Sequence, residues 1–286
     1  MTSARMLPLL FMLACGDSLP PDVATTTTMQ SDEAAIRTAA ALPHRSDANK
    51  KRDVYRHPIE TLAFFGVKPD MTVVEMYPGG GWYTEILAPL LKERGKLIVT
   101  TIDASSYTGT PQDKPGVKGA HDLAERFKAQ PDIFGKVQTT LIDPPNSWTL
   151  GPDGSADMVL TFRSIHDWVR DGYADKVLAA MYKVLKPGGV LGVVAHRSPN
   201  ASSDPAAVGK SGYLSEPFVI SIVEKAGFKL AGKSDVNANP KDAHDYPEGV
   251  WTLPPTLRLG DKYRDVYTTI GESDRMTLRF VKPGKP

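Results

Sequence analysis

The sequence is poor in cysteine and carries no excess charge of either sign. Cys15 is the single cysteine in 286 residues, so the chain cannot form a disulfide within itself. The chain has 34 basic and 33 acidic side chains, and its net charge of +1 gives no long-range attraction to nucleic acid or to anionic lipid. We therefore do not expect a nucleic acid among its partners.

The N-terminal segment contains a short apolar run, residues 6–14, after Arg5. The run is too short for a transmembrane helix, and its single positive charge and small residues are typical of a secretory signal. Cys15 follows Leu13 and Ala14, and this junction resembles the bacterial lipoprotein box, in which the cysteine is lipidated and becomes the mature N-terminus. The alternative is an ordinary cysteine beside a signal peptide cut elsewhere. We expect an exported protein on the periplasmic side, anchored to a bacterial membrane by a lipid on Cys15.

Composition divides the chain into a leader, a linker and one domain. The lipoprotein-type signal peptide covers 1–15, and residues 16–30 are rich in serine, threonine and proline, which is typical of a flexible tether. Hydrophobic residues make up 41% of the chain, enough for a core. The folded domain is expected over 31–286, with an N-terminal cap at 31–57 and a lid insertion at 236–274.

From residue 58 onward, short β-branched apolar segments alternate with helical segments. Strands are expected at 71–76, 95–102, 137–142, 156–162, 190–195, from 228 and at 275–281. Helices are expected at 33–41, 58–65, 82–93, 118–130, 174–185 and 216–226. This alternation indicates an α/β domain with a mostly parallel sheet and helices on both faces.

A glycine-rich loop follows the first strand, with the sequence Glu75-Met-Tyr-Pro-Gly-Gly-Gly81. Glycines allow a tight turn and a close approach of backbone to a ligand, and the next helix offers unpaired N–H groups. The loop resembles the acidic-x-Gly-x-Gly-x-Gly motif of class I S-adenosyl-L-methionine (SAM)-dependent methyltransferases. Glu75 stands at the acidic position and Gly79 and Gly81 at the second and third glycines, while Tyr77 replaces the first.

Other segments extend this resemblance over residues 58–283. Asp103 closes the second strand, where the family binds the ribose hydroxyls, and Asp143 closes the third, where methyltransferases often hold the adenine amino group. The segment 185–191 resembles the family's segment before strand five. The resemblance implies a Rossmann-like seven-stranded class I methyltransferase sheet, mostly parallel, with the last strand antiparallel.

The chain is more narrowly similar to a group of predicted exported bacterial methyltransferases without an assigned substrate. The segments that carry this similarity are 57–65, 78–85, 250–255 and 270–275. The resemblance implies S-adenosyl-L-methionine as the cofactor. The residues it assigns to the cofactor site are Glu75, Tyr77, Gly79, Gly80, Gly81, Asp103, Asp143 and Phe162.

Two histidines follow the fourth and fifth strands, His166 and His196. Open α/β sheets bind ligands beyond the carboxyl ends of their strands, so both side chains are expected near one crevice. Methyl transfer to an O–H or N–H acceptor needs a base, and the pKa of histidine suits that role. Alternatively each histidine only bonds loop backbone, or both join Asp167 in a metal site, although no ligand spacing on one element supports a metal.

Four further residues are expected to contact the substrate. Arg163 and Arg197 either bind an acidic substrate group as bidentate forks or pair with Asp167 or other nearby carboxylates. Tyr55 lies in the N-terminal cap and Trp251 in the lid insertion, two segments expected to cover the crevice.

The preferred function is SAM-dependent methyl transfer to a small-molecule acceptor. One alternative is a binding protein that keeps the methyltransferase sheet without catalysis. Another is a different enzyme that uses His166 and His196, although the absence of a Gly-x-Ser-x-Gly elbow excludes the usual serine hydrolase.

Overall fold

The computed structural model describes residues 21–102, 115–144 and 146–284, with side chains from Gln30 onward. Cys15 and Asp103 lie outside the described residues. Within them the strands are β1 (Thr72–Met76), β2 (Lys96–Ile102), β3 (Gln138–Ile142), β4 (Ala156–Phe162), β5 (Leu185–His196), β6 (Lys229–Ser234) and β7 (Arg275–Val281). The helices before β4 are α1 (Pro21–Ala41), α2 (Asp47–Lys50), α3 (Asp53–Arg56), α4 (Pro58–Phe65), α5 (Thr84–Leu91), α6 (Pro115–Ala129) and α7 (Pro131–Phe134). Those after β4 are α8 (Ile165–Arg170), α9 (Ala174–Val184), α10 (Pro205–Ser211), α11 (Glu216–Lys225), the 3₁₀ helix η2 (Gly249–Thr252) and α12 (Arg264–Ile270).

The described strands form one seven-stranded sheet in the order β3-β2-β1-β4-β5-β7-β6. Neighbours from β3 to β5 pair in parallel, and β7 runs antiparallel to both β5 and β6. The central strands β1 and β4 are buried on both faces, and most of their residues are apolar, as is usual for parallel strands. This topology confirms the predicted sheet and its antiparallel last strand.

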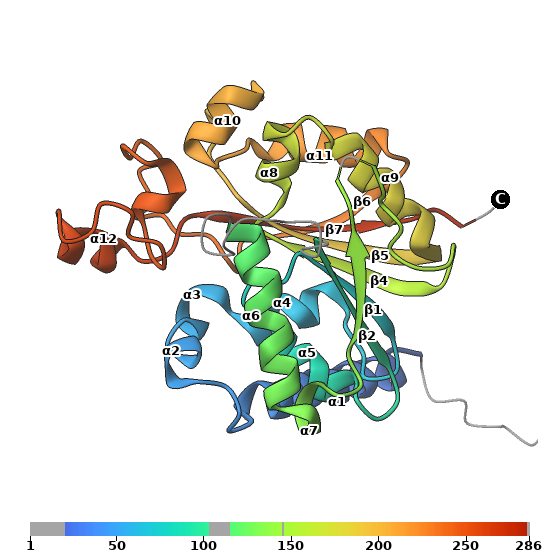
Figure 1. The fold of residues 1–286 in the computed structure, drawn as a ribbon. Helices are drawn as coiled ribbons and strands as arrows, with labels where there is room; N and C mark the ends of the chain where they lie inside the picture. The colour runs from blue at the N-terminus through green and yellow to red at the C-terminus, as the bar shows by residue number, and fades with distance from the viewer. Residues whose placement is uncertain (1–20, 103–114, 145, 285–286) are drawn as a thin grey trace, which may run out of the picture.

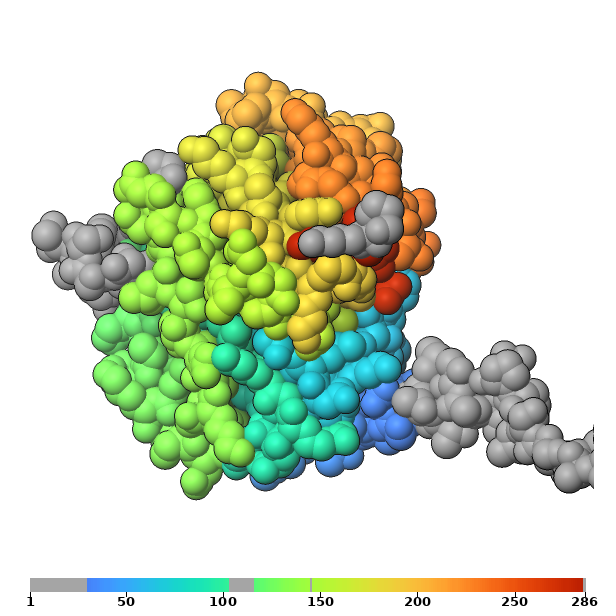
Figure 2. Space-filling model, turned by 90° about the vertical axis from the view of Figure 1, so that its right-hand side faces the viewer, coloured from blue at the N-terminus to red at the C-terminus, as the bar shows by residue number. Residues whose placement is uncertain are grey.

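Helices cover both faces of the sheet (Figure 1). On one face α8, α9 and α11 bury Trp168, Met181 and Val223 against the strands. On the other face α1, α4 and α5 bury a second apolar cluster that includes Ile36 and Leu87. Figure 2 shows the domain turned by 90°, with the N-terminal residues, coloured blue to teal, in the lower part and the residues coloured yellow and orange in the upper part.

Two boundaries differ from the sequence prediction by five residues or more. Helix α1 begins at Pro21, inside the predicted tether of 16–30, and proline is well suited to a first helical turn, where its missing N–H needs no partner. Strand β5 begins at Leu185 rather than at the predicted residue 190. Leu185 pairs with Ala156 and Val190 pairs with Met158, and the residues between these two pairs, Gly188 among them, form a bulge that is part of the strand. No helix in the described part of the chain is both long and apolar enough to cross a membrane.

The insertion at 236–274 is tied to the domain by buried polar side chains. Asn237 Nδ2 donates to Thr61 Oγ1 at 3.0 Å and to Thr277 Oγ1 at 2.9 Å. Asp242 accepts a hydrogen bond from Tyr213 Oη at 2.8 Å and another from the Asp274 backbone N–H at 2.7 Å. The segment is therefore held close to the carboxyl ends of β4 and β5.

Candidate functional site

A cavity of about 940 Å³ lies at the carboxyl ends of β1, β2, β3 and β4. Its floor includes Tyr77 and Gly79 from the glycine loop and Ile142 from β3. Helix α8 contributes His166 and Trp168 to its wall. Its volume falls in the usual range for a small-molecule site, roughly 300–1,000 Å³.

Three residues of the glycine loop have a left-handed backbone of the kind that favours glycine. Gly79 has φ 57° and Gly81 φ 77°, and Tyr77, which replaces the first glycine of the motif, has φ 47°. A tyrosine in this left-handed region is strained, and such strain concentrates at functional sites. The Tyr77 ring lies 6.0 Å from the Trp168 ring, and its buried Oη has no hydrogen-bond partner in the described part of the chain.

Gly81 lies close to α6 and has a left-handed backbone. A Cβ at this position would lie 2.8 Å from Leu123 Cδ1 of α6, closer than van der Waals contact allows. Gly81 therefore lets α6 pack against the loop, whereas Gly79 faces the cavity and Gly80 is exposed. Only Gly79 of the three predicted glycines lines the cavity.

Glu75 does not line the cavity, and its predicted contact with the cofactor stays a prediction. The carboxyl group is 1% exposed and accepts a hydrogen bond of 2.7 Å from Thr84 Oγ1, at the start of α5. Burial raises the pKa of Glu75 to about 7, although the Thr84 hydrogen bond acts in the opposite direction. Glu75 thus fixes the helix that follows the loop.

Asp143 borders the cavity at the end of β3, where the sequence places it. Its side chain is exposed and accepts a hydrogen bond of 3.0 Å from Asn146 Nδ2. Its role toward the adenine ring stays a prediction, as does that of Asp103.

Phe162 packs in the core and does not line the cavity, and its predicted cofactor role stays a prediction. Its ring is 9% exposed and stacks on the Tyr83 ring, with centroids 3.6 Å apart and planes 9° apart. Since side chains alternate between the faces of a strand, this residue faces α4 and α5 rather than the cavity.

The structure brings His166 and His196 together, with ring centroids 5.3 Å apart. His166 lines the cavity, and its buried Nδ1 has no hydrogen-bond partner among the described residues. His196 Nδ1 is 2.5 Å from Ser273 Oγ. Burial lowers the pKa of both histidines; His166 also lowers that of His196, while Asp167 partly offsets the effect on His166. Both imidazoles are therefore neutral at neutral pH, the form that accepts a proton.

Arg197 already has carboxylate partners, which corrects its predicted substrate contact. Its Nε and Nη2 donate to the two oxygens of Asp274 at 2.9 and 3.0 Å. Its Nη1 donates to Asp235 Oδ1 at 2.8 Å and lies 3.6 Å from Glu216 Oε2. The alternative of pairing with nearby carboxylates is the one observed, and Arg197 fastens both ends of the insertion to β5.

Arg163 and Tyr55 lie beside an ion-pair cluster that the sequence analysis did not anticipate. Arg163 directly follows β4 with φ 62°, a strained left-handed backbone. The backbone carbonyl of Tyr55 accepts a hydrogen bond of 2.5 Å from Arg275 Nη2. Arg275 and Arg56 both pair with the buried Glu272. These residues are far apart in the sequence, and only the spacing of Arg52 and Arg56, one helical turn, could have signalled a shared face.

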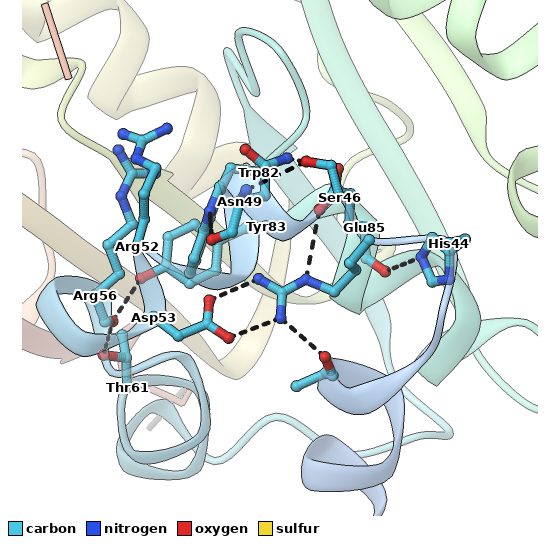
Figure 3. Close-up of polar contacts among 12 residues, drawn as sticks. His44, Ser46, Asn49, Arg52, Asp53, Arg56, Thr61, Trp82, Tyr83 and Glu85 are labelled. Atoms are coloured by element: carbon cyan, nitrogen blue, oxygen red, sulfur yellow. Dashed lines mark hydrogen bonds and ion pairs between the residues drawn. The ribbon is translucent and has the colours of Figure 1, made fainter.

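The N-terminal cap packs on the helix that follows the glycine loop (Figure 3). Trp82 Nε1 donates to the Asn49 carbonyl at 3.0 Å, and Tyr83 Oη donates to the Arg56 carbonyl at 3.3 Å. The Arg56 guanidinium carbon lies 4.7 Å from the centroid of the Trp82 ring, a cation–π contact. The loop and the cap therefore position each other.

The insertion reaches the cavity through Trp251, and the predicted contact of this residue with the substrate stays a prediction. Its ring lies 5.9 Å from the His166 ring, and Arg258 stacks over it at 4.6 Å. Both residues line the cavity. Among the described residues no group of three or more histidine, cysteine, aspartate or glutamate side chains is arranged to hold a metal ion.

The residues of this cavity fit SAM. Gly79 presents backbone without a Cβ, and a Cβ built there would meet no atom within 4 Å, so a ligand can approach closely. Tyr77 Oη and His166 Nδ1 are buried polar atoms that have no described partner in the protein, and both residues line the cavity. Asp143 adds an acceptor at the opposite wall.

The chain matches no protein-family model and no curated protein sequence. Solved structures share its fold at low identity. One is a SAM-dependent methyltransferase from Aquifex aeolicus, at 17% identity over 88% of this chain and 98% of that one, with a TM-score of 0.52. Another is the cyclase SpnF, at 14% identity over 86% and 85%, with a TM-score of 0.53. A third is a putative sarcosine dimethylglycine methyltransferase from Galdieria sulphuraria, at 13% identity over 83% and 86%, with a TM-score of 0.51. The chain has the class I methyltransferase fold, as its sequence predicted.

Proposed function

We propose that the protein transfers a methyl group from SAM to a small-molecule acceptor. The observation that carries the proposal is the cavity of about 940 Å³ at the glycine loop, where this fold binds its ligand. Two of the similar structures are named as methyltransferases. Tyr77, Gly79 and Asp143 would hold SAM, together with Asp103 at the end of β2.

When bound, SAM supplies a methyl group activated by its sulfonium. His166 would take the proton from an O–H or N–H acceptor, because its imidazole is neutral and borders the cavity. Ser273 fixes the ring of His196. Trp251 and Trp168 present apolar surface in the cavity and limit the entry of water.

Isothermal titration calorimetry with SAM and S-adenosylhomocysteine (SAH) tests the cofactor. We expect both to bind, and Asp143→Ala and Asp103→Ala to weaken binding at least about tenfold, a loss equivalent to one hydrogen bond to a charged group. Asp153→Ala, an exposed carboxylate remote from the loop in sequence, is the control and should leave affinity unchanged. No binding at millimolar SAM or SAH would refute methyl transfer.

The role of His166 is tested separately from cofactor binding. We expect His166→Gln to retain SAH affinity but to lower kcat by about 10²–10⁴-fold once an acceptor is known, the usual contribution of a general base. An unchanged kcat would remove His166 from the mechanism.

A second candidate is a different reaction, or ligand binding alone, on the same fold. The similarity to a cyclase favours keeping it, because a fold does not specify its chemistry. Tyr77 favours it too, since its ring stands where the motif has glycine. Binding of another nucleoside-like ligand without SAM or SAH would support this candidate.

We also propose that the protein is exported and anchored by a lipid on Cys15. The support is the order of Arg5, the apolar run and Cys15 in the sequence. Cell fractionation tests it: Cys15→Ser should move the protein from the membrane to the soluble fraction. Met12→Leu, which brings the segment closer to the lipoprotein box, should stay with the membrane. Unchanged fractionation of Cys15→Ser would contradict the anchor.

A further inference from the structure

Four arginines gather around one glutamate beside the histidine pair; we call Arg52, Arg56, Arg163, Arg275 and Glu272 the arginine cluster. Arg52 Nε lies 2.8 Å from Glu272 Oε1. Glu272 Oε2 lies 2.9 Å from Arg56 Nε and 3.1 Å from Arg275 Nη1. Figure 3 shows the Arg52 and Arg56 guanidinium groups on the same side of Tyr83, pointing away from Asp53. Arg163 interacts electrostatically with Glu272, Arg275 and Arg52.

The arginine cluster carries more positive charge than its own carboxylate neutralises. Four guanidinium groups face one carboxylate, a net charge of +3, and among the described residues only Glu272 pairs with them. Arg52 Nη2 and Arg56 Nη2 are buried and have no hydrogen-bond partner there. No hydrogen bond or ion pair joins the Arg163 guanidinium to another residue in the described ranges. The donors of the cluster are thus only partly used.

The cluster is also largely withdrawn from solvent. Arg56 is 1% exposed, Arg275 3% and Glu272 3%. Burial lowers the pKa of Arg163 to about 10, and it lowers that of Arg56 as well, with Arg163 acting in the same direction. The guanidinium group of arginine is not deprotonated in proteins, so both side chains are taken as cationic. Buried charges are normally paired, so an anion from outside the protein would stabilise a cluster of this charge.

The cofactor does not supply that charge. SAM has one carboxylate, but it also has an ammonium and a sulfonium, so its net charge is positive. Its carboxylate could pair with one arginine, but a cofactor with a net positive charge would not neutralise the net positive charge of the cluster. The acceptor is the remaining partner of the proposed reaction.

The position of the cluster suits an acceptor. Arg275 on β7 lies opposite His196 on β5 in the register of the sheet. Arg163 lies two residues before α8, the helix that contains His166. Arg163, Arg275 and Arg56 lower the pKa of His196, which places their charges close to the histidine pair. The Arg52 side chain is 24% exposed and opens the cluster to solvent. His166 itself lines the cavity, so the histidine pair connects the cavity with the cluster.

We propose that the arginine cluster binds the anionic group, a carboxylate or a phosphate, of the molecule that is methylated. This inference rests on the proposed methyl transfer and names its substrate class. Arginine forks match both anions in geometry, and the partly used donors of Arg52, Arg56 and Arg163 supply the hydrogen bonds. The rest of the acceptor then lies toward His166 and the cavity.

Calorimetric titration of the full protein with inorganic phosphate, and separately with succinate, tests the proposal at constant ionic strength. We expect the wild type to bind at least one of them and Arg163→Gln to bind it at least tenfold more weakly. Binding of phosphate alone indicates a phosphorylated acceptor, and binding of succinate alone a carboxylate. Arg37→Gln on the exposed face of α1 is the matched control and should bind like the wild type.

Chemical unfolding without added anion separates a ligand site from a structural role. We expect Arg163→Gln to be at least as stable as the wild type, because the change removes an unpaired cation from a crowded positive cluster. A variant that is less stable, with unchanged phosphate affinity, would overturn the proposal. Failure of both phosphate and succinate to bind the wild type at millimolar concentration would also overturn it.

Titration of SAH into the same variants distinguishes this proposal from the proposed function. SAH affinity should be equal in the wild type and in Arg163→Gln. If SAH affinity falls together with phosphate affinity, the cluster serves the cofactor and the inference about the acceptor is wrong. If the wild type binds phosphate but not SAH, methyl transfer fails while the anion site stands.

Discussion

Tyr77 adopts a backbone conformation that glycine adopts more easily. It replaces the first glycine of the motif and has φ 47°, in the left-handed region. We expect Tyr77→Gly to be more stable than Tyr77→Ala by about 1 kcal/mol, because both lose the ring but only alanine keeps the left-handed strain. Urea unfolding measures the difference.

The control for Tyr77 is an alanine at an ordinary helical position. Ala124→Gly, at an exposed position within α6, should lower the free energy of unfolding by about 0.5–1 kcal/mol. Alanine is thus expected to be more stable than glycine at position 124, whereas glycine is expected to be more stable than alanine at position 77. If alanine equals or exceeds glycine at 77, the loop is not strained there.

Glu75 makes the stability of the protein depend on pH. Its pKa is raised by burial from 4.5 to about 7, so between these values the folded state holds a proton that the unfolded state has lost. Stability from this group is fully present below pH 4.5 and falls as pH rises toward 7, by up to about 3 kcal/mol. Glu75→Gln cannot ionise and should lack this fall.

The test for Glu75 is urea unfolding of the wild type and Glu75→Gln at pH 4.5 and pH 8. We expect the variant to be the more stable protein at pH 8 and the two to be similar at pH 4.5. Taking the difference between the proteins cancels the titration of His166 and His196. Equal stability at both pH values would show that Glu75 ionises normally.

At the scale of elements, helix α1 is part of the core rather than a linker. Ile36 is fully buried, and α1 packs on α4 and α5. We expect Ile36→Ala to lower the free energy of unfolding by about 2–5 kcal/mol, the usual result of removing a buried aliphatic side chain. Arg37→Ala, whose side chain is 61% exposed, should change it by less than about 0.5 kcal/mol in the same denaturant experiment. A loss below about 1 kcal/mol for Ile36→Ala would mean that α1 is only loosely attached.

The insertion is a second element whose role depends on its contacts. Arg197 joins the end of β5 to Asp235 and Asp274, the residues at either end of the insertion. This arrangement brings Trp251 over the cavity and Glu272 into the arginine cluster. The sequence predicted that this segment covers the crevice. It did not predict that Glu272, near the C-terminal end of the insertion, pairs with the arginine cluster.

At the scale of the whole molecule, the cofactor should stabilise the fold by mass action. Both core clusters rest on one sheet, so the domain is expected to unfold as a unit. At a hundredfold excess of SAH over its Kd, we expect about 2.7 kcal/mol of added stability and a rise in Tm of roughly 5–10 °C. Differential scanning calorimetry measures it, with adenosine at equal concentration as the control. No rise in Tm would mean that the folded domain does not bind SAH.

The sequence by itself determined the sheet. The strands at 72–76, 156–162 and 275–281 and the glycine loop follow from local pattern, because the side chains of a segment determine its tendency to form a buried strand or a tight turn. The antiparallel direction of the last strand followed from the resemblance to the methyltransferase sheet. His166 and His196 were predictable for the same reason, since both follow strands whose carboxyl ends meet at one edge.

Only the tertiary structure decided which side chains act together. Phe162 faces the core because of strand alternation, Glu75 turns to Thr84, and Arg197 finds Asp274. The arginine cluster joins residues more than two hundred positions apart, Arg52 and Glu272 among them. No local sequence pattern predicts these long-range contacts, because they depend on how the cap, β4 and the insertion pack around one another.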